Sequence, residues 1–215
     1  MNIKQITFSK NQYYQEEVTK SQIYIHHTAG NSDAVNVFRD WETNDEKIAT
    51  CAVISGIGKN CIDGEIVQGF SSKYWAYHLG VKKSVFSQLG LPYVSLDKIS
   101  IGIEICNWGQ LTKKDNKFYN YVNREVTDVC ELSTPHKGYK FYHNYTDAQI
   151  ESVRELLISW KQKYNIPLDY NEDIWGITNR ALTGKSGIFT HNSVRHDKVD
   201  CYPHPKLVAM LKDLQ

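Results

Sequence analysis

Short stretches of alternating apolar and polar residues predict β-strands along this chain. In residues 22–28, Ile23 and Ile25 alternate with aromatic and polar positions, a pattern that predicts a strand ending at His26 and His27. Because consecutive side chains of a strand point to opposite faces, we expect these two histidines on opposite sides of a sheet.

Further apolar runs predict the remaining strands. Residues 51–55 and 61–67 are apolar runs around glycine, asparagine and aspartate turn signals, which predict two antiparallel strands. Residues 99–106 are nearly all apolar except for Glu104 and predict another strand. A last short strand is predicted over 187–191.

Three segments carry the helical repeat. A helix is predicted after Asp33, because apolar residues recur there with helical spacing at Ala34, Val37, Phe38 and Trp41. Residues 145–164 show the clearest helical pattern, and Thr146 with Gln149 forms a capping box at its start. Pro205 opens a final helix.

The order of these elements predicts the fold class. Strand, helix, three strands, helix, strand and helix follow one another, which is typical of an α/β or α+β domain with a central mixed β-sheet flanked by α-helices. We therefore expect a single domain over residues 1–215, with its core at about 20–214. The stretches 109–144 and 168–185 are long for connections, and we expect inserted binding loops or lids there.

The charge balance narrows the class of partner. The chain of 215 residues has 25 Lys and Arg against 24 Asp and Glu, a net charge of +1, so no strong field favours nucleic acid or a membrane surface as a partner. Its 14 Tyr, 5 Trp and 8 His supply flat amphipathic faces and imidazoles, which suit sugars, peptides or a metal ion.

The cysteines and the N-terminal residues indicate the cellular compartment in which the chain is made. The 5 cysteines are scattered without a Cys-x-x-Cys pair, which favours free thiols in a reducing compartment. Residues 1–20 lack the apolar core of a secretory signal, and no apolar run approaches the roughly 20 residues that span a bilayer. We therefore expect a chain without a signal peptide that is cytoplasmic on synthesis.

Two predicted strand ends concentrate groups that bind metal ions. His26 closes the first strand, and His191 closes the last one before a loop that carries His196, Asp200 and Cys201. Catalytic zinc takes three such ligands and one water, so two histidines and one loop residue would complete the set. A strand-end histidine can also be an ordinary hydrogen-bonded residue, and such a loop can be a solvated turn.

A carboxylate within an apolar strand and an aromatic loop complete the candidates. Burial of an unpaired Glu104 is costly, so this side chain is neutralised, paired or kept for acid–base work at a raised pKa. The loop from Trp75 to Gly80, which includes His78, either grips a sugar or peptide or caps the core.

Taken together and in this order, the four segments resemble the zinc-dependent N-acetylmuramoyl-L-alanine amidases of the type-2 family, which are related to peptidoglycan recognition proteins. The His-His-Thr-Ala-Gly strand end, the Ile-Gly-Ile-Glu strand and the loop with Lys, any residue and Asp carry the resemblance. It implies Zn²⁺ held by His26, His191 and Asp200. It also implies a general base at Glu104 and an oxyanion partner at Lys198.

The resemblance implies hydrolysis of the amide between the lactyl group of N-acetylmuramic acid and L-alanine, in peptidoglycan or a muropeptide. Trp75, His78 and Asn107 are the candidates for holding the glycan or stem peptide. Many members place a Tyr-His pair at the start of the second strand, where this chain has Thr50 and Cys51. A tyrosine contribution to the transition state is therefore not expected.

The identity of the third ligand is open between two neighbours. Asp200 and Cys201 are adjacent, and adjacent side chains of an extended segment point to opposite sides, so only one of them can reach the metal. The step of two residues from Lys198 and the later Pro203 favour Asp200.

The biological role also has alternatives. The aromatic stretch after Asn107 resembles phage and prophage endolysins, which act on the cell wall after release through a holin, and we expect a monomer of that kind. A peptidoglycan-binding module without hydrolysis would lack a ligand or the base, whereas all are present here. A cytoplasmic amidase that recycles muropeptides stays open.

Overall fold

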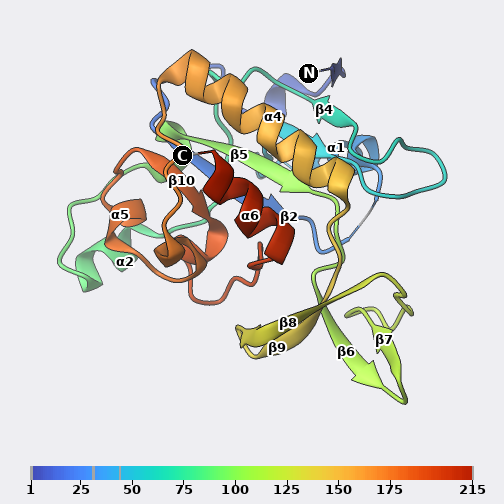
Figure 1. Cartoon of the computed structure of the whole chain (residues 1–215). Helices are drawn as coiled ribbons and strands as arrows, with labels where there is room; N and C mark the ends of the chain where they lie inside the picture. Colours follow the sequence, from blue (N-terminus) through green and yellow to red (C-terminus); the bar gives the residue numbers. More distant parts are fainter. Residues whose placement is uncertain (1, 31, 44, 215) are drawn as a thin grey trace.

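A six-stranded mixed sheet forms the centre of the molecule in a computed structural model, which describes residues 2–30, 32–43 and 45–214 (Figure 1). The strand order is β1-β4-β3-β5-β2-β10, and β3 and β4 are antiparallel as predicted, while the other neighbours are parallel. The fold class is therefore confirmed. The strands are β1 (Ile3–Gln5), β2 (Gln22–His27), β3 (Ala52–Ile54), β4 (Ile66–Gln68), β5 (Ser100–Ile105) and β10 (Gly187–Thr190).

Helices pack against this sheet. In Figure 1, α4 (Asp147–Tyr164) and α6 (Pro205–Asp213) lie side by side, and α1 (Ala34–Trp41) packs against β3 and β4. The predicted capping box of Thr146 and Gln149 is present at the start of α4. No helix of the described residues is long and apolar enough to cross a membrane. The short helices are α2 (Lys83–Gln88), α3 (Leu96–Ile99), α5 (Asn179–Leu182), η1 (Lys10–Gln12), η2 (Glu172–Trp175) and η3 (His191–Ser193).

The middle of the sheet is the most deeply buried part. Every residue of β2 and β10 is buried, and Glu104 is the single residue of β5 that is not fully buried. Strands that are covered on both faces consist of nearly continuous apolar residues, which explains the apolar runs in the sequence. A polar side chain in these strands is therefore held in a protein environment and needs a partner or a function.

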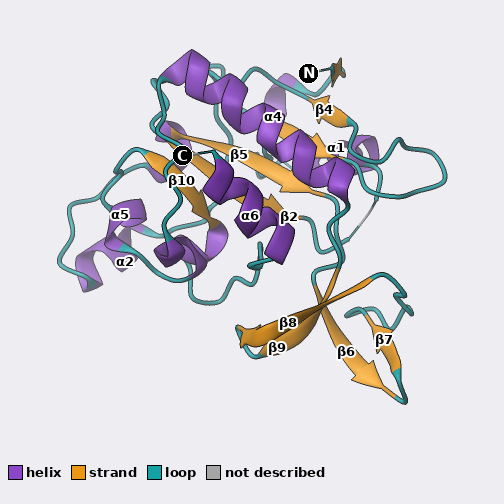
Figure 2. Ribbon diagram, in the orientation of Figure 1, coloured by secondary structure: helices purple, strands orange, loops and turns teal. Residues whose placement is uncertain are grey.

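The stretch 109–144 contains strands that the sequence pattern did not reveal. We predicted loops or lids, but the segment folds into a second sheet of order β7-β6-β9-β8, which lies apart from the helices in Figure 2. Few residues of its strands are buried and several are charged, so the apolar signal of a strand is weak. Its strands are β6 (Gln110–Lys114), β7 (Lys117–Tyr119), β8 (Val129–His136) and β9 (Tyr139–His143).

Other differences from the predicted elements are smaller. The strand predicted over 61–67 is reduced to β4, because the residues before it form a turn around Gly64. The stretch 168–185 holds the short helices η2 and α5. The N-terminal residues, for which no strand was predicted, add β1 to the edge of the sheet.

The second sheet packs onto the C-terminal part of the core. The ring of Tyr142 in β9 stacks on Tyr202, with centroids 4.1 Å apart, and the Tyr202 hydroxyl donates to the carbonyl oxygen of His143 at 2.8 Å. At the tip of the β8–β9 hairpin, Lys137 Nζ donates to the carbonyl oxygen of His196 at 3.2 Å. The insertion thus supports the loop that follows η3.

Candidate metal centre

Two neighbouring strands present His26 and Glu104 on the same face of the sheet. The β2–β5 register pairs His26 with Glu104, and paired residues of parallel neighbours point to the same side. His27 points to the other side, where its Nδ1 lies 2.8 Å from the hydroxyl of Tyr145, just before α4. His26 and Glu104 therefore lie on the face turned away from α4.

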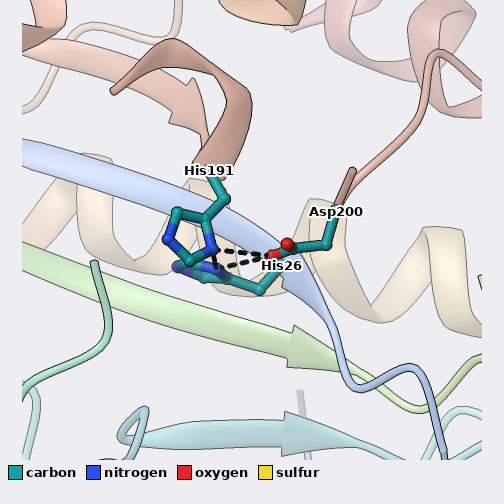
Figure 3. A group of neighbouring side chains, drawn as sticks. All are labelled: His26, His191 and Asp200. Atoms are coloured by element: carbon teal, nitrogen blue, oxygen red, sulfur yellow. Dashed lines mark hydrogen bonds and ion pairs between the residues drawn. The ribbon is translucent and has the colours of Figure 1, made fainter. Parts of the chain in front are cut away.

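A loop brings the other members of the site to this face. His191 begins η3 directly after β10, and Asp200 follows nine residues later on an irregular segment. The Asn192 side chain donates to the carbonyl oxygens of Asp200 at 3.2 Å and Cys201 at 2.7 Å, which folds this segment back onto η3. Figure 3 shows the resulting cluster of His26, His191 and Asp200.

Three potential ligand atoms converge in this cluster. His26 Nδ1 lies 3.2 Å from His191 Nδ1, and each nitrogen lies 3.0 Å from Asp200 Oδ2 (Figure 3). Burial lowers the pKa of His26 to about 4, so its ring is neutral at neutral pH.

The surroundings of His191 fix the position of its ring proton. Nε2 lies 2.9 Å from the carbonyl oxygen of Leu79. Because a carbonyl oxygen only accepts, Nε2 carries the proton, and in the neutral ring Nδ1 has a free lone pair. That lone pair faces His26 and Asp200.

A chain of hydrogen bonds places the ring proton of His26 on Nε2 as well. The Ser100 hydroxyl donates its one proton to the carbonyl oxygen of Leu96 at 2.7 Å, so its oxygen accepts from His78 Nε2 at 2.8 Å. Burial holds the pKa of His78 well below its ordinary value, so this ring is neutral and its Nδ1 accepts from His26 Nε2 at 3.0 Å. His26 therefore also turns a lone pair of Nδ1 towards the cluster.

This arrangement fits a zinc ion. Lone pairs on three atoms only 3.0 to 3.2 Å apart repel one another unless a cation lies between them. Ligands about 2.0–2.1 Å from a tetrahedral zinc are about 3.3 Å from each other, which is close to the observed spacing. Two imidazoles and one carboxylate are also a ligand set that catalytic zinc uses.

Glu104 lies beside the cluster as an unpaired buried carboxyl group. Among the described residues its Oε2 has no hydrogen-bond partner, although the atom is buried. Burial raises the pKa of Glu104 well above its ordinary value, the charge of Asp200 raises it further, and that of Lys198 lowers it. Lys198 is half-buried and forms no ion pair within the described part of the chain, so its ammonium group is free to meet an anion.

The two neighbours considered for the third ligand point in different directions. The carboxylate of Asp200 lies in the cluster, whereas Cys201 is fully buried next to Tyr145. All five cysteines are free thiols, and burial raises the pKa of Cys201 above its ordinary value, so this thiol stays protonated.

The three residues predicted to hold substrate already use their polar atoms within the protein. The indole of Trp75 donates to Glu16 at 3.0 Å, and both ring nitrogens of His78 are engaged as described. The Asn107 amide donates to the carbonyl oxygens of His143 and Asn144, at 3.1 and 2.9 Å, and ties the two ends of the insertion together. Their contact with substrate stays a prediction.

Sequence reasoning missed the residues that support the cluster from behind. Leu79 contributes a backbone carbonyl, which no side-chain motif can reveal. Ser100 is a single serine at the start of a strand, and Asn192 follows His191 without a recognisable spacing. His78 was the one recognisable signal, and no pattern in the sequence connected it with His26.

Comparison with known proteins places this geometry in a family. A family model described as N-acetylmuramoyl-L-alanine amidase matches residues 16–205. Comparison with curated proteins gives no match.

Several solved structures share the fold. The structure of PlyL is 15% identical, with 100% of this chain and 98% of that chain covered and a TM-score of 0.55. The PlyG catalytic domain is 14% identical, with 100% and 95% covered and a TM-score of 0.55. The N-acetylmuramoyl-L-alanine amidase LysC from Clostridium intestinale URNW is 14% identical, with 100% and 99% covered and a TM-score of 0.50.

At these low sequence identities the solved structures support only the fold, whereas the family match indicates the chemistry. The matched range includes the cluster of His26, His191 and Asp200 as well as Glu104 and Lys198. Because the match covers most of its residues, the chain belongs to the N-acetylmuramoyl-L-alanine amidase family, the hydrolases that cleave the amide between the glycan and the stem peptide of peptidoglycan.

Proposed function

We propose that this chain hydrolyses the amide between the lactyl group of N-acetylmuramic acid and L-alanine with one zinc ion held by His26, His191 and Asp200. The observation that carries the proposal is the convergence of two imidazole lone pairs and a carboxylate oxygen beside an unpaired buried carboxyl group. When bound, zinc supplies Lewis acidity that makes water a usable nucleophile at neutral pH.

Glu104 is proposed as the general base and acid. A buried carboxyl group with a raised pKa can hold a proton near neutral pH, and the positive charges of Lys198 and the metal draw its pKa back down. It can therefore take a proton from the attacking water and return it to the departing amine of L-alanine. No hydrogen bond to another described residue has to break first, because Oε2 has none.

Lys198 is proposed to stabilise the negative charge that develops on the carbonyl oxygen. It is on the same loop as Asp200, so the loop that completes the metal cluster also delivers the cation. An ammonium group without an ion-pair partner among the described residues loses no existing contact when it meets this oxygen.

We further propose that residues 1–215 act as one amidase domain and that the protein is a cell-wall lysin. The likeness to PlyL and to the PlyG catalytic domain over the full length of this chain supports a domain of this kind. The monomeric state and release through a holin are parts of the same proposal. A muropeptide-recycling role differs from it in the substrate, which is soluble instead of an intact wall.

Digestion of purified peptidoglycan tests the function. We expect new L-alanine N-termini and free lactyl groups without new reducing sugar ends, and we expect chelation to abolish and zinc to restore the release. New reducing ends would identify a glycosidase, and a fully active preparation without metal would contradict the zinc site.

Two further substrates separate the alternatives. A binding module would sediment with peptidoglycan and release nothing. A recycling amidase would cleave soluble anhydro-muropeptides while leaving the intact wall nearly untouched. A lysin should solubilise the intact wall.

A further inference from the structure

We infer that His78, held by Ser100, is a positioning residue that keeps His26 in the one tautomer able to bind the metal through Nδ1. This inference rests on the proposed metal site, and it names residues that set the affinity of that site for zinc. It assigns His78 a role behind the cluster, in place of a contact with the substrate.

The inference follows from which atom donates and which accepts in each hydrogen bond. The carbonyl oxygen of Leu96 can only accept, so the Ser100 proton is committed to it at 2.7 Å. His78 must then donate from Nε2 to Ser100 and accept at Nδ1 from His26. A proton on His26 Nε2 is thereby stabilised, and one on its Nδ1, which would block the metal, is disfavoured.

The same short segment also orients the second imidazole. The residue after His78 is Leu79, and its carbonyl oxygen accepts from His191 Nε2 at 2.9 Å. The Asp97 carboxylate oxygen Oδ1 accepts from the backbone N–H groups of both residues, at 2.8 and 2.9 Å, and fixes the segment. One bracket, built from residues 78–79 and clamped by Asp97 and Ser100, therefore sets the proton positions of both histidine ligands.

The hydrogen-bond partners behind a ligating histidine matter because a metal competes with a proton for the same nitrogen lone pair. Removal of a partner behind a ligating histidine usually lowers metal affinity about 10- to 100-fold. His78 is suited to this task because a neutral imidazole accepts on one side and donates on the other. A carboxylate here would accept on both sides and would leave the Ser100 oxygen without a donor.

Zinc affinity, measured by competition with a chelator, provides the first test. We expect Ser100→Ala to weaken zinc binding roughly 10- to 100-fold, since His78 is then free to adopt either tautomer. Ser100→Thr keeps the hydroxyl and should stay within about threefold of the wild type. Equal affinity of Ser100→Ala and wild type would overturn the inference.

A matched control separates positioning from general stability. The Ser152 hydroxyl in α4 donates to the carbonyl oxygen of Gly64 at 2.6 Å, on the opposite side of the sheet from the cluster. Ser152→Ala removes a similar bond and should leave zinc affinity unchanged, even if the unfolding midpoint falls as far as in Ser100→Ala. A loss of zinc affinity that follows stability in both variants would contradict a specific role.

The tautomer of His78 can be measured directly in the metal-free wild type by long-range ¹H–¹⁵N correlation spectra. We expect the proton on Nε2, and a proton on Nδ1 would overturn the inference even if every variant failed to fold. The outcomes also separate the two proposals. A wild type that binds no zinc contradicts the metal site, whereas tight zinc binding with the wrong His78 tautomer contradicts only the bracket.

Discussion

The two halves of the proposed site are built in different ways. His26 and Glu104 are neighbours in register on β2 and β5, where the backbone ladder of the buried sheet fixes both side chains. Lys198 and Asp200 lie on an irregular loop that is held by the Asn192 side chain and by contacts with the inserted sheet.

The two halves should therefore differ in their tolerance of substitutions. The strand half depends on backbone hydrogen bonds that the fold needs in any case, so substitutions elsewhere should not move its two side chains, although the proton position of His26 depends on His78 and Ser100. The loop half depends on a few side-chain contacts between distant segments, so substitutions outside the cluster can also misplace Asp200. Variants in each half, and in the contacts behind the loop, test this difference.

The largest effect is expected in the loop half, from Asp200→Ala. Loss of one of three ligands should remove zinc and lower activity by roughly 1000-fold or more. Zinc content after gel filtration and turnover of peptidoglycan measure the two effects. Cys201→Ser is the matched control, because its thiol is buried away from the cluster and the variant should keep zinc. Zinc loss in the control alone would move the ligand to Cys201.

In the strand half, Glu104→Gln should leave zinc bound but lower kcat roughly 100-fold or more, because the amide cannot take a proton. Zinc content, peptidoglycan binding and kcat are the measurements. The change keeps the shape of the side chain, so the fold should persist. Hydrolysis within a few-fold of the wild type would show that Glu104 is not the base.

Lys198→Met should lower kcat roughly 10- to 100-fold while zinc content stays constant. The reason is that the loop cation contributes to the transition state and not to metal binding. The exposed Lys212→Met on α6 is a control for the loss of one positive charge. A change in KM alone would instead indicate a contact with bound substrate.

Tyr202→Phe tests the support of the loop half by the inserted sheet. Loss of the hydrogen bond to His143 should lower the free energy of unfolding by about 1 kcal/mol. Because the ring stack with Tyr142 remains, zinc affinity should fall by only a few-fold. Chemical denaturation and chelator competition give the two values, and Tyr139→Phe at the exposed edge should change neither.

The subtlest effect is a pH dependence of stability in the strand half. Burial raises the pKa of Glu104, so the folded protein holds this proton more tightly than the unfolded chain. Stability from this group is therefore full below the ordinary value of 4.5 and falls as the pH rises towards the folded pKa. Metal-free Glu104→Gln should match the wild type near about pH 4 and exceed it in unfolding free energy at higher pH.

A wild type that gained stability relative to Glu104→Gln with rising pH would contradict the sign. It would mean that the carboxylate form is the stabilised one in the metal-free protein.

Local patterns in the sequence were sufficient for the strand half. Alternation placed His26 and His27 on opposite faces, and the apolar strand around Glu104 indicated a buried carboxyl group. Both conclusions follow because the two-residue repeat of a strand fixes side-chain direction without knowledge of the neighbouring strands.

The loop half and the bracket behind the site could be identified only from the tertiary structure. The distance from Asp200 to His26, the choice between Asp200 and Cys201, and the contact of His78 with His26 all join segments far apart in the sequence. The second sheet could not be predicted either, because its strands bury few residues and carry little apolar signal. Local periodicity reports burial on one face, whereas the direction of a hydrogen bond between distant segments depends on how the whole chain packs.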